Sequence, residues 1–512
     1  MPIRTAERNV VVARLGPSVL DCTAVRIAAL VLLLTVAAIY ESYRITAFIN
    51  DNIWWHLRTG LWILQKHAFP RAGWFSQYAD KPWVACSWGF DVLMAAAYKL
   101  SGLGALPALL MGFKVALAAV TFFLARARPG GFWCAVLLSA MAQYVMVDLQ
   151  LAPMLFSVLF FGIELLLLLQ SRQRNDVRPL FWLPVLFFLW ANLDGQFLNG
   201  LLLLGLFLAA EAAEFLLHIS AASSFPAPPH SLGKVSAVAG LSVVATLVTP
   251  YSFHLYPSAF QAAYSQVLFE NFLEMQAMAF RRPQHFVLLL LVMAAFLALG
   301  RRRSRDLFKF GVLGVFAMLA FRVQRDVWCV VLPAIAVIAG AVADGEDEAE
   351  AGTPAPTPKN SPRWKWEKPL VAVLVLAAFL AAIIRVPNSN ALMSQVSQTF
   401  PVKACDFIRA NQLPGPLFNA YSWGGFLIWY LPEYPVAMDG RLNLYGDEIS
   451  ERYFKVTEGT ERLETEPSFV GAHTILLEPN SGLLKALTTL PVLRAQFRVA
   501  YQDDVAVVLV RQ

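Results

Sequence analysis

Residues 26–60 read RIAALVLLLTVAAIYESYRITAFINDNIWWHLRTG, and the two halves of this stretch predict the architecture of the chain. The first half is an apolar run long enough to cross a bilayer as a helix, which takes about 20 residues. The run continues into Ile45–Phe48 without a small-residue cleavage site, so we expect a retained membrane helix and not a signal peptide. The second half gathers an aspartate, two tryptophans, a histidine and an arginine directly where that helix would leave the lipid.

The rest of the chain shares the apolar character of this first run. The 512 residues are 58% hydrophobic and only 15% charged, and their mean hydropathy is +0.55. In soluble domains about a quarter of the residues are charged. A chain this apolar cannot cover itself with polar surface, so we expect lipid to surround much of its length.

Charge and cysteine content exclude two classes of protein. The net charge of +6 comes from arginines clustered between apolar runs, which is typical of membrane topology and not of nucleic-acid binding. The five cysteines show no CxxC spacing, which argues against a disulfide framework or a zinc site.

About eleven apolar runs qualify as spanning helices. The expected spans are Arg26–Phe48, Leu103–Leu124, Gly131–Val147, Pro153–Leu169, Leu180–Asn192, Leu198–His218, Val235–Val248, Phe286–Leu299, Phe308–Phe321, Val327–Ala341 and Pro369–Ile384.

Basic residues in alternate loops predict the orientation of these spans. The positive-inside rule places the arginine-rich loops and the N-terminus in the cytoplasm, so an odd number of crossings leaves the C-terminus outside. The intervening short loops around Asp148 and Asp194 hold no basic residue. The basic residues are Arg126 and Arg128, then Arg172, Arg174 and Arg178, then Arg301, Arg302, Arg303 and Arg305.

The predicted fold is mostly α, a polytopic transmembrane bundle with a small C-terminal α/β soluble domain. We expect a transmembrane module over residues 1–343, whose first outer loop is 49–101. An acidic, proline-rich cytoplasmic linker is expected over 344–368, a last transmembrane helix over 369–386 and an extracytoplasmic domain over 387–512.

Short periodic runs after residue 387 predict the elements of the C-terminal domain. The expected helices are Val402–Asn411, Glu448–Thr457 and Ser481–Leu490, and the expected strands are Pro416–Ala420, Pro435–Met438, His473–Leu477 and Val505–Val510.

The first outer loop opens with Asp51, Trp54, Trp55, His56 and Arg58. A carboxylate at the membrane boundary, walled by aromatic rings and close to cations, is where a base of perturbed pKa would sit. We expect all four of the other residues to contact substrate: Trp54, Trp55, His56 and Arg58. His56 would act as an orienting hydrogen-bond donor more than as a base. The alternative is an interfacial amphipathic helix with an aromatic belt, because tryptophan favours the headgroup region.

The pattern D-x-x-WWHL-x-x-G in this loop resembles the first outer loop of bacterial GT-C superfamily glycosyltransferases. Weaker resemblances to the same superfamily continue along most of the chain, and the last two match members with a C-terminal extracytoplasmic domain. They are APMLFS at 152–157, WANLDG at 190–195, TPY at 249–251, FRVQRD at 321–326, NAYSWGGFL at 419–427 and MDGR at 438–441.

This resemblance implies a hexosyl- or pentosyltransferase of the bacterial inner membrane. Its implied partners are the lipid bilayer, a polyprenyl-phosphate-linked sugar as donor, and an acceptor glycan, lipid or protein. Two positions depart from the superfamily pattern: Ala152 replaces an arginine and Asp194 replaces a histidine. A transporter or lipid scramblase gated by the aromatic loop, and a non-catalytic GT-C-like scaffold, are the alternatives.

Transfer from a polyprenyl phosphate needs few catalytic groups, because the leaving phosphate is already a stable anion. One carboxylate must take the proton of the acceptor hydroxyl, and cations must hold the phosphate. Asp51 is the candidate base, and Arg322 and Arg325 are the candidate phosphate clamp, since guanidinium matches phosphate bidentately. Glu270 and Glu274 share a helical face and are further candidates for substrate contact.

The remaining candidates are carboxylates and one arginine on the predicted outer side. Asp148 and Asp194 are each expected to hold the acceptor or a divalent cation, because carboxylates suit hard cations. If a cation binds, Asp51 and Asp148 are its expected ligands. Solvated loop carboxylates are the alternative. Asp439 and Arg441 follow a short predicted strand, where α/β folds present ligands, although a turn with an Asp–Arg pair explains them equally well.

Overall fold

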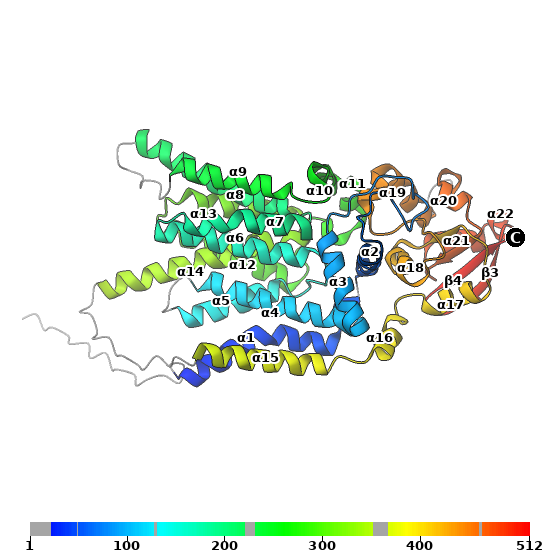
Figure 1. The fold of residues 1–512 in the computed structure, drawn as a ribbon, viewed down its shortest axis with the longest axis horizontal. Coiled ribbons are helices and arrows are strands. Elements are labelled where there is room, and N and C mark those ends of the chain that lie inside the picture. Colours follow the sequence, from blue (N-terminus) through cyan, green and yellow to red (C-terminus); the bar gives the residue numbers. More distant parts are fainter. Residues whose placement is uncertain (1–21, 49, 127–130, 221–230, 352–366, 460–462) are drawn as a thin grey trace, which may run out of the picture.

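The structure is a computed structural model that describes residues 22–512 apart from 49, 127–130, 221–230, 352–366 and 460–462. Its long helices run lengthwise through one half of the molecule, and shorter helices and a small sheet form the other half (Figure 1). The long helices are α1 Thr23–Arg44, α4 Ala105–Ala125, α5 Phe132–Val145, α6 Met154–Arg174, α7 Leu183–Leu193 with the 3-10 turn η4 Arg178–Trp182, α8 Phe197–Ser220, α9 Leu232–Thr246, α12 Pro283–Arg301, α13 Leu307–Arg322, α14 Trp328–Ala351 and α15 Glu367–Ile384.

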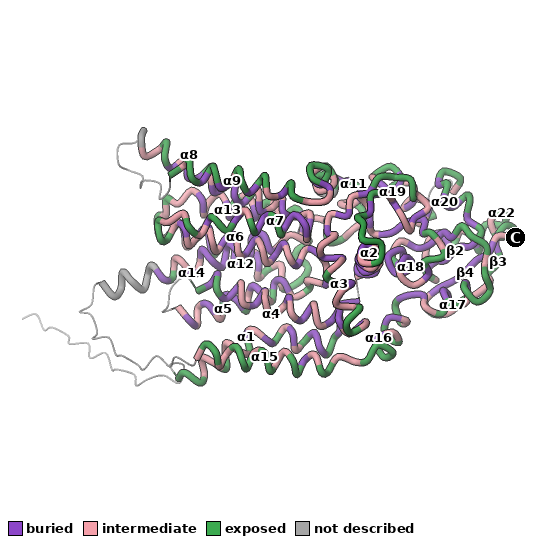
Figure 2. Tube along the Cα trace, viewed as in Figure 1, coloured by how far each residue is buried: buried purple, intermediate pink, exposed green. Residues whose placement is uncertain are grey.

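Helices occupy all eleven predicted spans. By length and composition, seven stretches of the described chain are able to cross a membrane. Helices α5 and α9, and η4 together with α7, are apolar but shorter. Helix α15 lies at the edge of the bundle, where it packs on α1 with only Ala382 fully buried, so much of its surface is left for lipid (Figure 2). The chain is therefore a mostly helical, multi-pass membrane protein.

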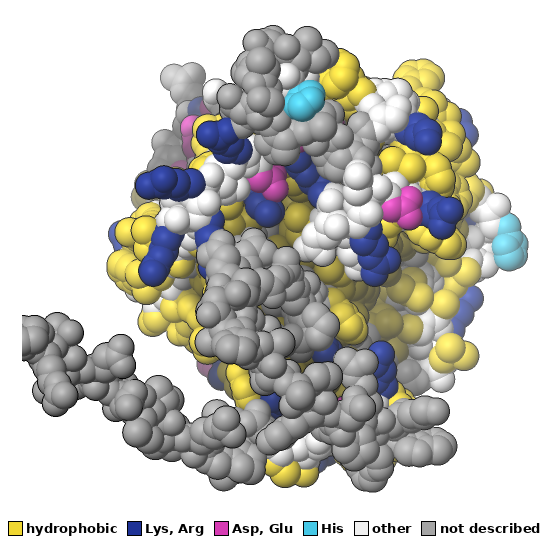
Figure 3. Space-filling view, turned by 90° about the vertical axis from the view of Figure 1, so that its left-hand side faces the viewer, with side chains coloured by type: hydrophobic (Ala, Val, Ile, Leu, Met, Phe, Trp, Pro, Cys, Tyr) yellow, Lys and Arg dark blue, Asp and Glu magenta, His cyan; other side chains and the backbone are white. Residues whose placement is uncertain are grey.

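The basic loops gather at the end of the bundle that lies farthest from the C-terminal sheet (Figure 1; Figure 3). At this end Arg172 of α6 forms ion pairs with Glu214 of α8 and with Asp306, the last at 3.2 Å. Asp306 also caps α13 by accepting from the Lys309 N–H. The structure thus separates a cationic end from an opposite end, which we call the outer end in keeping with the predicted orientation.

The predicted first outer loop contains two helices, α2 Asn52–Lys66 and α3 Trp88–Ser101. Helix α2 buries Ile53, Leu57 and Ile63 at helical spacing, while Trp54 is completely buried. It packs on α3 of the membrane module along one side and on α18 Gly424–Tyr430 of the C-terminal region along the other. Helix α2 is therefore the joint between the two halves of the molecule.

The other short elements lie at the outer end or in the C-terminal region. They are η2 Thr46–Phe48, η3 Gly102–Gly104, η5 Ser252–His254, α10 Leu255–Tyr264, α11 Gln266–Asn271, η6 Leu273–Met275, η7 Gln324–Asp326, α16 Ser389–Val396, α17 Val402–Ala410, η8 Tyr421–Trp423, α19 Leu442–Glu458, η9 Leu463–Thr465, α20 Pro467–Val470, α21 Gly482–Thr489 and α22 Pro491–Arg494.

The C-terminal sheet is mixed, with strand order β1-β2-β4-β3. Strand β1 Leu417–Asn419 pairs parallel with β2 Thr474–Leu477, and β4 Val507–Arg511 pairs antiparallel with both β2 and β3 Phe497–Gln502. Three of the four predicted strands are present, and β3 was not predicted. Residues 435–438 form no strand, which is a correction to the prediction.

Residues 435–438 bond to the outer loop and to one side chain in place of a strand ladder. The Val436 N–H donates to the Phe75 carbonyl at 3.0 Å, and the Val436 carbonyl accepts from the Gln77 N–H at 3.0 Å. The Asn419 side chain accepts from the Ala437 N–H and donates to the Met438 carbonyl, at 2.8 and 2.9 Å. These bonds satisfy the backbone, so the segment needs no neighbouring strand.

The predicted linker begins later than expected, because α14 continues as a helix to Ala351. Most of the remaining linker, at 352–366, lies outside the described residues, as does Arg128 of the first basic loop.

Candidate functional site

Asp51 lies at the start of α2, where its carboxylate meets the C-terminal region. The backbone N–H groups of Gly425 and Phe426 donate to its two oxygens at 3.3 and 3.2 Å. Burial raises the pKa of Asp51 well above its usual range, although these two hydrogen bonds lower it; Asp439 nearby raises it further. Asp51 therefore has a raised proton affinity in a half-buried position.

Two glycines at the start of α18 have no room for a side chain. A Cβ atom on Gly425 would lie 2.5 Å from the Asp51 carbonyl oxygen, and one on Gly424 would lie 2.1 Å from the Met438 carbonyl oxygen. Neither glycine has a positive φ, so the requirement is space and not backbone conformation. Gly425 is thus explained by close approach of the two halves, and Gly424 by close packing within the C-terminal region.

Tyr421, in the 3-10 turn before α18, brings a phenol to the same place. Its ring packs against Phe272 and Phe454, with centroids 5.3 Å away in each case. Burial raises the pKa of Tyr421 well above its usual range, and the charges of Asp51 and Glu274 raise it further. Tyr421 therefore stays protonated and can donate a hydrogen bond.

His56 is paired with Asp91 of α3, a residue that the sequence analysis did not single out. The His56 Nδ1 and Asp91 Oδ1 atoms lie 2.6 Å apart, and the exposed fractions of the two residues are 5% and 0%. The imidazole stacks on Trp55, with ring centroids 3.5 Å apart. Within the described chain, Asp91 Oδ2 is buried without a hydrogen-bond partner. A carboxylate placed inside an apolar run was the available sequence signal for Asp91.

Trp54, Trp55 and Arg58 take different positions around α2. Trp54 is enclosed by rings of the C-terminal region, among them Trp429 at 4.7 Å between centroids, and so acts in packing. The Trp55 indole N–H donates to Asn52 at 3.1 Å. The guanidinium of Arg58 lies over the Phe75 ring at 5.5 Å, and its buried Nε has no hydrogen-bond partner among the described residues.

Asp194 links its own motif, WANLDG at 190–195, to the motif APMLFS at 152–157. Its carboxylate accepts from the Ser157 hydroxyl, which in turn accepts from the Trp190 indole N–H at 2.6 Å. Asp194 is 9% exposed. Burial raises its pKa to about 6, against the lowering effects of the Ser157 hydrogen bond and of Arg325. Asp194 is therefore a carboxylate that titrates close to neutral pH.

The two arginines of the predicted clamp face the segment α11–η6. Arg325 pairs with Asp326 at 3.0 Å, and Gln196, in the amide orientation that satisfies both groups, accepts from it at 2.8 Å. Arg325 also lies close enough to Glu274 for their charges to interact. Arg322 is exposed, with its guanidinium 5.4 Å from the centroid of the Phe269 ring.

Electrostatic interactions relate five polar residues that we call the outer cluster: Asp51, Tyr421, Glu274, Arg325 and Asp194. Each neighbour in this order interacts electrostatically with the next. The residues come from five separate parts of the chain, four in the membrane module and one in the C-terminal region. The cluster thus combines three carboxylates, one cation and a protonated phenol.

Asp148 lies apart from these contacts. It pairs with Arg282 at 2.9 Å, and both side chains are about two thirds exposed, at 67% and 65%. Asp51 and Asp148, the carboxylates predicted to bind a divalent cation, therefore have separate partners. Over the described part of the chain, no three His, Cys, Asp or Glu side chains gather in a way that could hold a metal ion.

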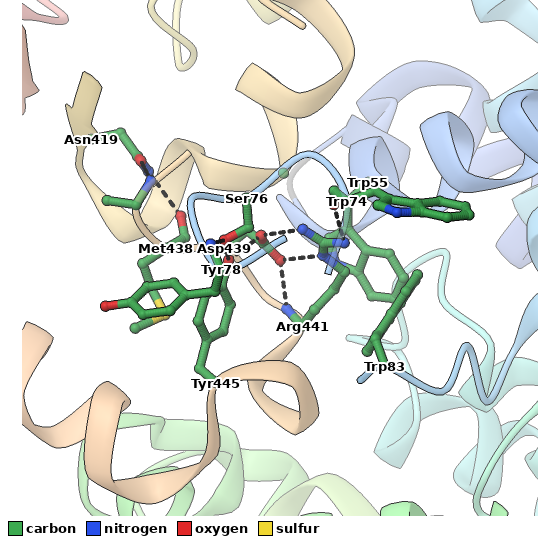
Figure 4. A network of polar contacts seen from close by, with 12 residues as sticks. Trp55, Trp74, Ser76, Tyr78, Trp83, Asn419, Met438, Asp439, Arg441 and Tyr445 are labelled. Carbon is green, nitrogen blue, oxygen red and sulfur yellow. Dashed lines mark hydrogen bonds and ion pairs between the residues drawn. The ribbon is translucent and has the colours of Figure 1, made fainter. Parts of the chain in front are cut away.

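Asp439 and Arg441 form a closed unit that we call the clasp, together with Tyr445 and the carbonyl of Trp74 (Figure 4). Arg441 donates to Asp439 through Nε and Nη2 at 2.9 and 2.8 Å, and through Nη1 to the Trp74 carbonyl at 2.8 Å. The Tyr445 hydroxyl donates to Asp439 at 2.5 Å. Both charged side chains are completely enclosed. The clasp ties the C-terminal region to the first outer loop and leaves these groups little capacity for a ligand.

Comparison with known proteins identifies the fold. No protein-family model and no curated protein sequence matches the chain. The oligosaccharyltransferase of Archaeoglobus fulgidus, tethered with an acceptor peptide, is similar in structure with a TM-score of 0.56 at 11% identity, over 96% of this chain and 74% of that one. Its apo form gives a TM-score of 0.53 at 10% identity, over 89% and 69%.

ArnT from Cupriavidus metallidurans, bound to undecaprenyl phosphate, has a TM-score of 0.44 at 15% identity, over 96% of this chain and 98% of that one. The likeness to the oligosaccharyltransferase shows that this chain has a GT-C-like fold.

Proposed function

We propose that the protein is a membrane glycosyltransferase that moves a sugar from a polyprenyl-phosphate donor to an acceptor hydroxyl on the extracytoplasmic face. The observation that carries this proposal is the position of the Asp51 carboxylate, which lies half-buried between α2 and α18 at the outer end of a GT-C-like bundle. Arg325 of η7 lies at the same end. The similarity to an oligosaccharyltransferase supports transfer of sugar as the reaction class.

The charges of the outer cluster suit this chemistry. A polyprenyl phosphate would leave as an anion, which Arg325 is able to bind as a fork and Arg322, exposed nearby, is able to approach. Asp326 and Gln196 hold the Arg325 guanidinium in place. Glu274 and Asp194, whose charges interact with Arg325, offer acceptors for sugar hydroxyls.

Asp51 is our proposed general base. Its raised pKa makes it a stronger proton acceptor than an ordinary carboxylate. Each of its oxygens accepts one backbone hydrogen bond and keeps further acceptor capacity for the proton of an acceptor hydroxyl. Trp55 and His56 are proposed to border the substrate, with Asp91 orienting the imidazole.

The test is transfer from radiolabelled polyprenyl-phosphate sugars by the purified protein in liposomes. Asp51→Asn keeps the size of the side chain but cannot take a proton, so turnover should fall by at least about a hundredfold, the lower end for a general base. Donor binding should survive, because the phosphate is held elsewhere. Asp80→Asn, at an exposed carboxylate in the same outer loop, is the matched control.

Transfer by Asp51→Asn at nearly the wild-type rate would remove Asp51 from the chemistry. Wild-type protein that transfers no sugar but moves fluorescent lipid between leaflets would instead favour a scramblase.

A further inference from the structure

The turn from Tyr421 to Phe426 brings the C-terminal region into direct contact with the candidate base. Two successive backbone N–H groups of this turn, those of Gly425 and Phe426, donate to different oxygens of Asp51. Two separate bonds define both the position and the plane of a carboxylate, whereas a single bond would leave it free to rotate.

Steric contacts hold the turn against α2 independently of these hydrogen bonds. The Trp54 ring lies edge-on to Phe426 at 5.4 Å between centroids. A Cβ atom on Gly440 would lie 1.6 Å from Asn52 Oδ1, so the segment between α18 and α19 also touches α2 without any gap. With the clasp added, the C-terminal region cannot slide along α2 without breaking several buried contacts.

The identity of residue 425 is best explained by this contact. Alanine is a better helix former than glycine by about 1 kcal/mol, and position 425 lies in the first turn of α18. An alanine Cβ would come within 3.2 Å of both Asp51 carboxylate oxygens and 2.5 Å of the Asp51 carbonyl. The helix by itself would therefore tolerate alanine, and the approach to Asp51 is what excludes it.

We propose that the C-terminal region is part of the catalytic site, and that the Gly425 and Phe426 N–H groups position the Asp51 carboxylate for proton transfer. This inference rests on the proposed function. In the transfer step the acceptor oxygen bonds to the anomeric carbon, and the sugar–phosphate bond breaks with its electron pair leaving on the polyprenyl phosphate. The acceptor proton passes to Asp51. Gly425 and Phe426 are positioning residues, since they act through Asp51.

The first experiment compares Gly425→Ala with Gly471→Ala in the full-length protein, reconstituted in liposomes with radiolabelled polyprenyl-phosphate sugars. Gly471 lies in the same region, and a Cβ there meets its nearest neighbour at 3.4 Å, an ordinary contact. Gly425→Ala should lower kcat by about tenfold or more, as expected for loss of hydrogen bonds to a charged group, with little change in the donor KM. Gly471→Ala should behave as wild type.

A double variant separates positioning from general damage. If Gly425 acts through Asp51, adding Gly425→Ala to Asp51→Asn should cause little further loss, because the base is already absent. Two independent losses that multiply would overturn the proposal. So would a wild-type kcat in Gly425→Ala alone.

The pH profile of kcat gives a second signature. The two N–H groups favour the ionised form of Asp51, so their loss should move the acidic limb of the profile to higher pH. Asp439 and Tyr421 are the other titratable groups facing Asp51, and Asp439 is committed to the clasp. A uniform loss of rate at every pH would contradict positioning.

Asp51→Glu keeps the proposal testable if Gly425→Ala does not fold. This change keeps a carboxylate but moves its oxygens by one methylene group relative to the Gly425 and Phe426 N–H groups, so it should lower kcat. A wild-type kcat in Asp51→Glu would then overturn the proposal. Absence of sugar transfer by the wild-type protein would defeat the proposed function itself, which is a different outcome.

Discussion

The clasp and the outer cluster are built from the same kinds of residue but differ in how many bonding positions are already used. In the clasp, Arg441 and Asp439 saturate each other with the help of Tyr445 and the Trp74 carbonyl, and both side chains are fully enclosed. In the outer cluster, Asp51 and Asp194 each accept hydrogen bonds and keep further acceptor capacity. The charge of Asp51 interacts with the Tyr421 phenol, and that of Asp194 with Arg325.

This difference separates a structural role from a chemical one. A buried ion pair whose donors and acceptors are all matched holds two parts together, and removing one partner leaves an uncompensated charge. A group of carboxylates with raised pKa and spare acceptors is costly for folding and is the kind of arrangement found at active sites. Charged residues in a motif therefore do not reveal by themselves which of the two arrangements they form.

The largest effect should come from breaking the clasp. Arg441→Ala leaves Asp439 buried and unpaired, so we expect a loss of roughly 3–5 kcal/mol in the free energy of unfolding. Thermal unfolding in detergent would measure it, with Arg409→Ala on an exposed pair of the same region as the control. A stable Arg441→Ala protein with a raised donor KM would instead return Arg441 to the substrate site.

Next is the phosphate clamp of the outer cluster. Arg325→Ala should raise the donor KM by roughly ten- to a hundredfold, the range for loss of a charged hydrogen bond, and more than Arg325→Lys does, because lysine keeps the charge but loses the fork. Arg498→Ala, an exposed arginine on β3, should leave the KM unchanged. Equal and negligible effects of both Arg325 variants would remove this residue from the site.

A smaller effect should appear in the pH dependence of stability through Asp194. Its folded pKa of about 6 lies above the ordinary value of 3.8, so the folded state disfavours the ionised form. Wild-type stability should therefore fall as pH rises from about 4 to about 6, and Asp194→Asn should lack this fall. Unfolding temperatures at pH 4.5 and 7.5 would measure it; the Asn variant should gain on the wild type only at the higher pH. An equal difference at both pH values would contradict the raised pKa.

The smallest effect is expected at Asp148 and Arg282. Both side chains are well exposed, so Asp148→Asn should change the free energy of unfolding by less than about 1 kcal/mol and leave sugar transfer near the wild-type rate. The dependence of sugar transfer on the concentration of a divalent cation should likewise be the same in Asp148→Asn and in the wild type. A large loss of transfer in this variant would restore Asp148 as a metal or acceptor ligand and would extend the outer cluster toward the surface.

The spanning helices were predictable because their signal is local. A run of about 20 apolar residues has one stable arrangement in lipid, whichever helix packs beside it. Amphipathic patterns, which are also local, predicted α17, α19 and α21. Strand β3 was not predicted, because its exposed and half-buried positions give little alternation. The strand predicted at residues 435–438 is absent, because the Asn419 side chain replaces a ladder there.

The candidate site was predictable only in part. Asp51, Asp194 and Arg325 stood out as charged groups at the ends of apolar runs, whereas the electrostatic interactions that relate them through Glu274 and Tyr421 depend on the fold. Asp91 did not stand out, because its partner His56 is 35 residues away along the chain and their pairing depends on how α2 packs against α3.

What the sequence alone determined is the membrane bundle and the set of polar groups near its outer end, because burying apolar surface in lipid depends on composition and helical length. Only the tertiary structure decided what each of those groups does. Whether a carboxylate is saturated, as Asp439 is, or keeps spare acceptors, as Asp51 does, depends on donors supplied by distant segments. Hydrogen bonds act over about 3 Å, so bonding capacity is set by folded neighbours and not by the motif.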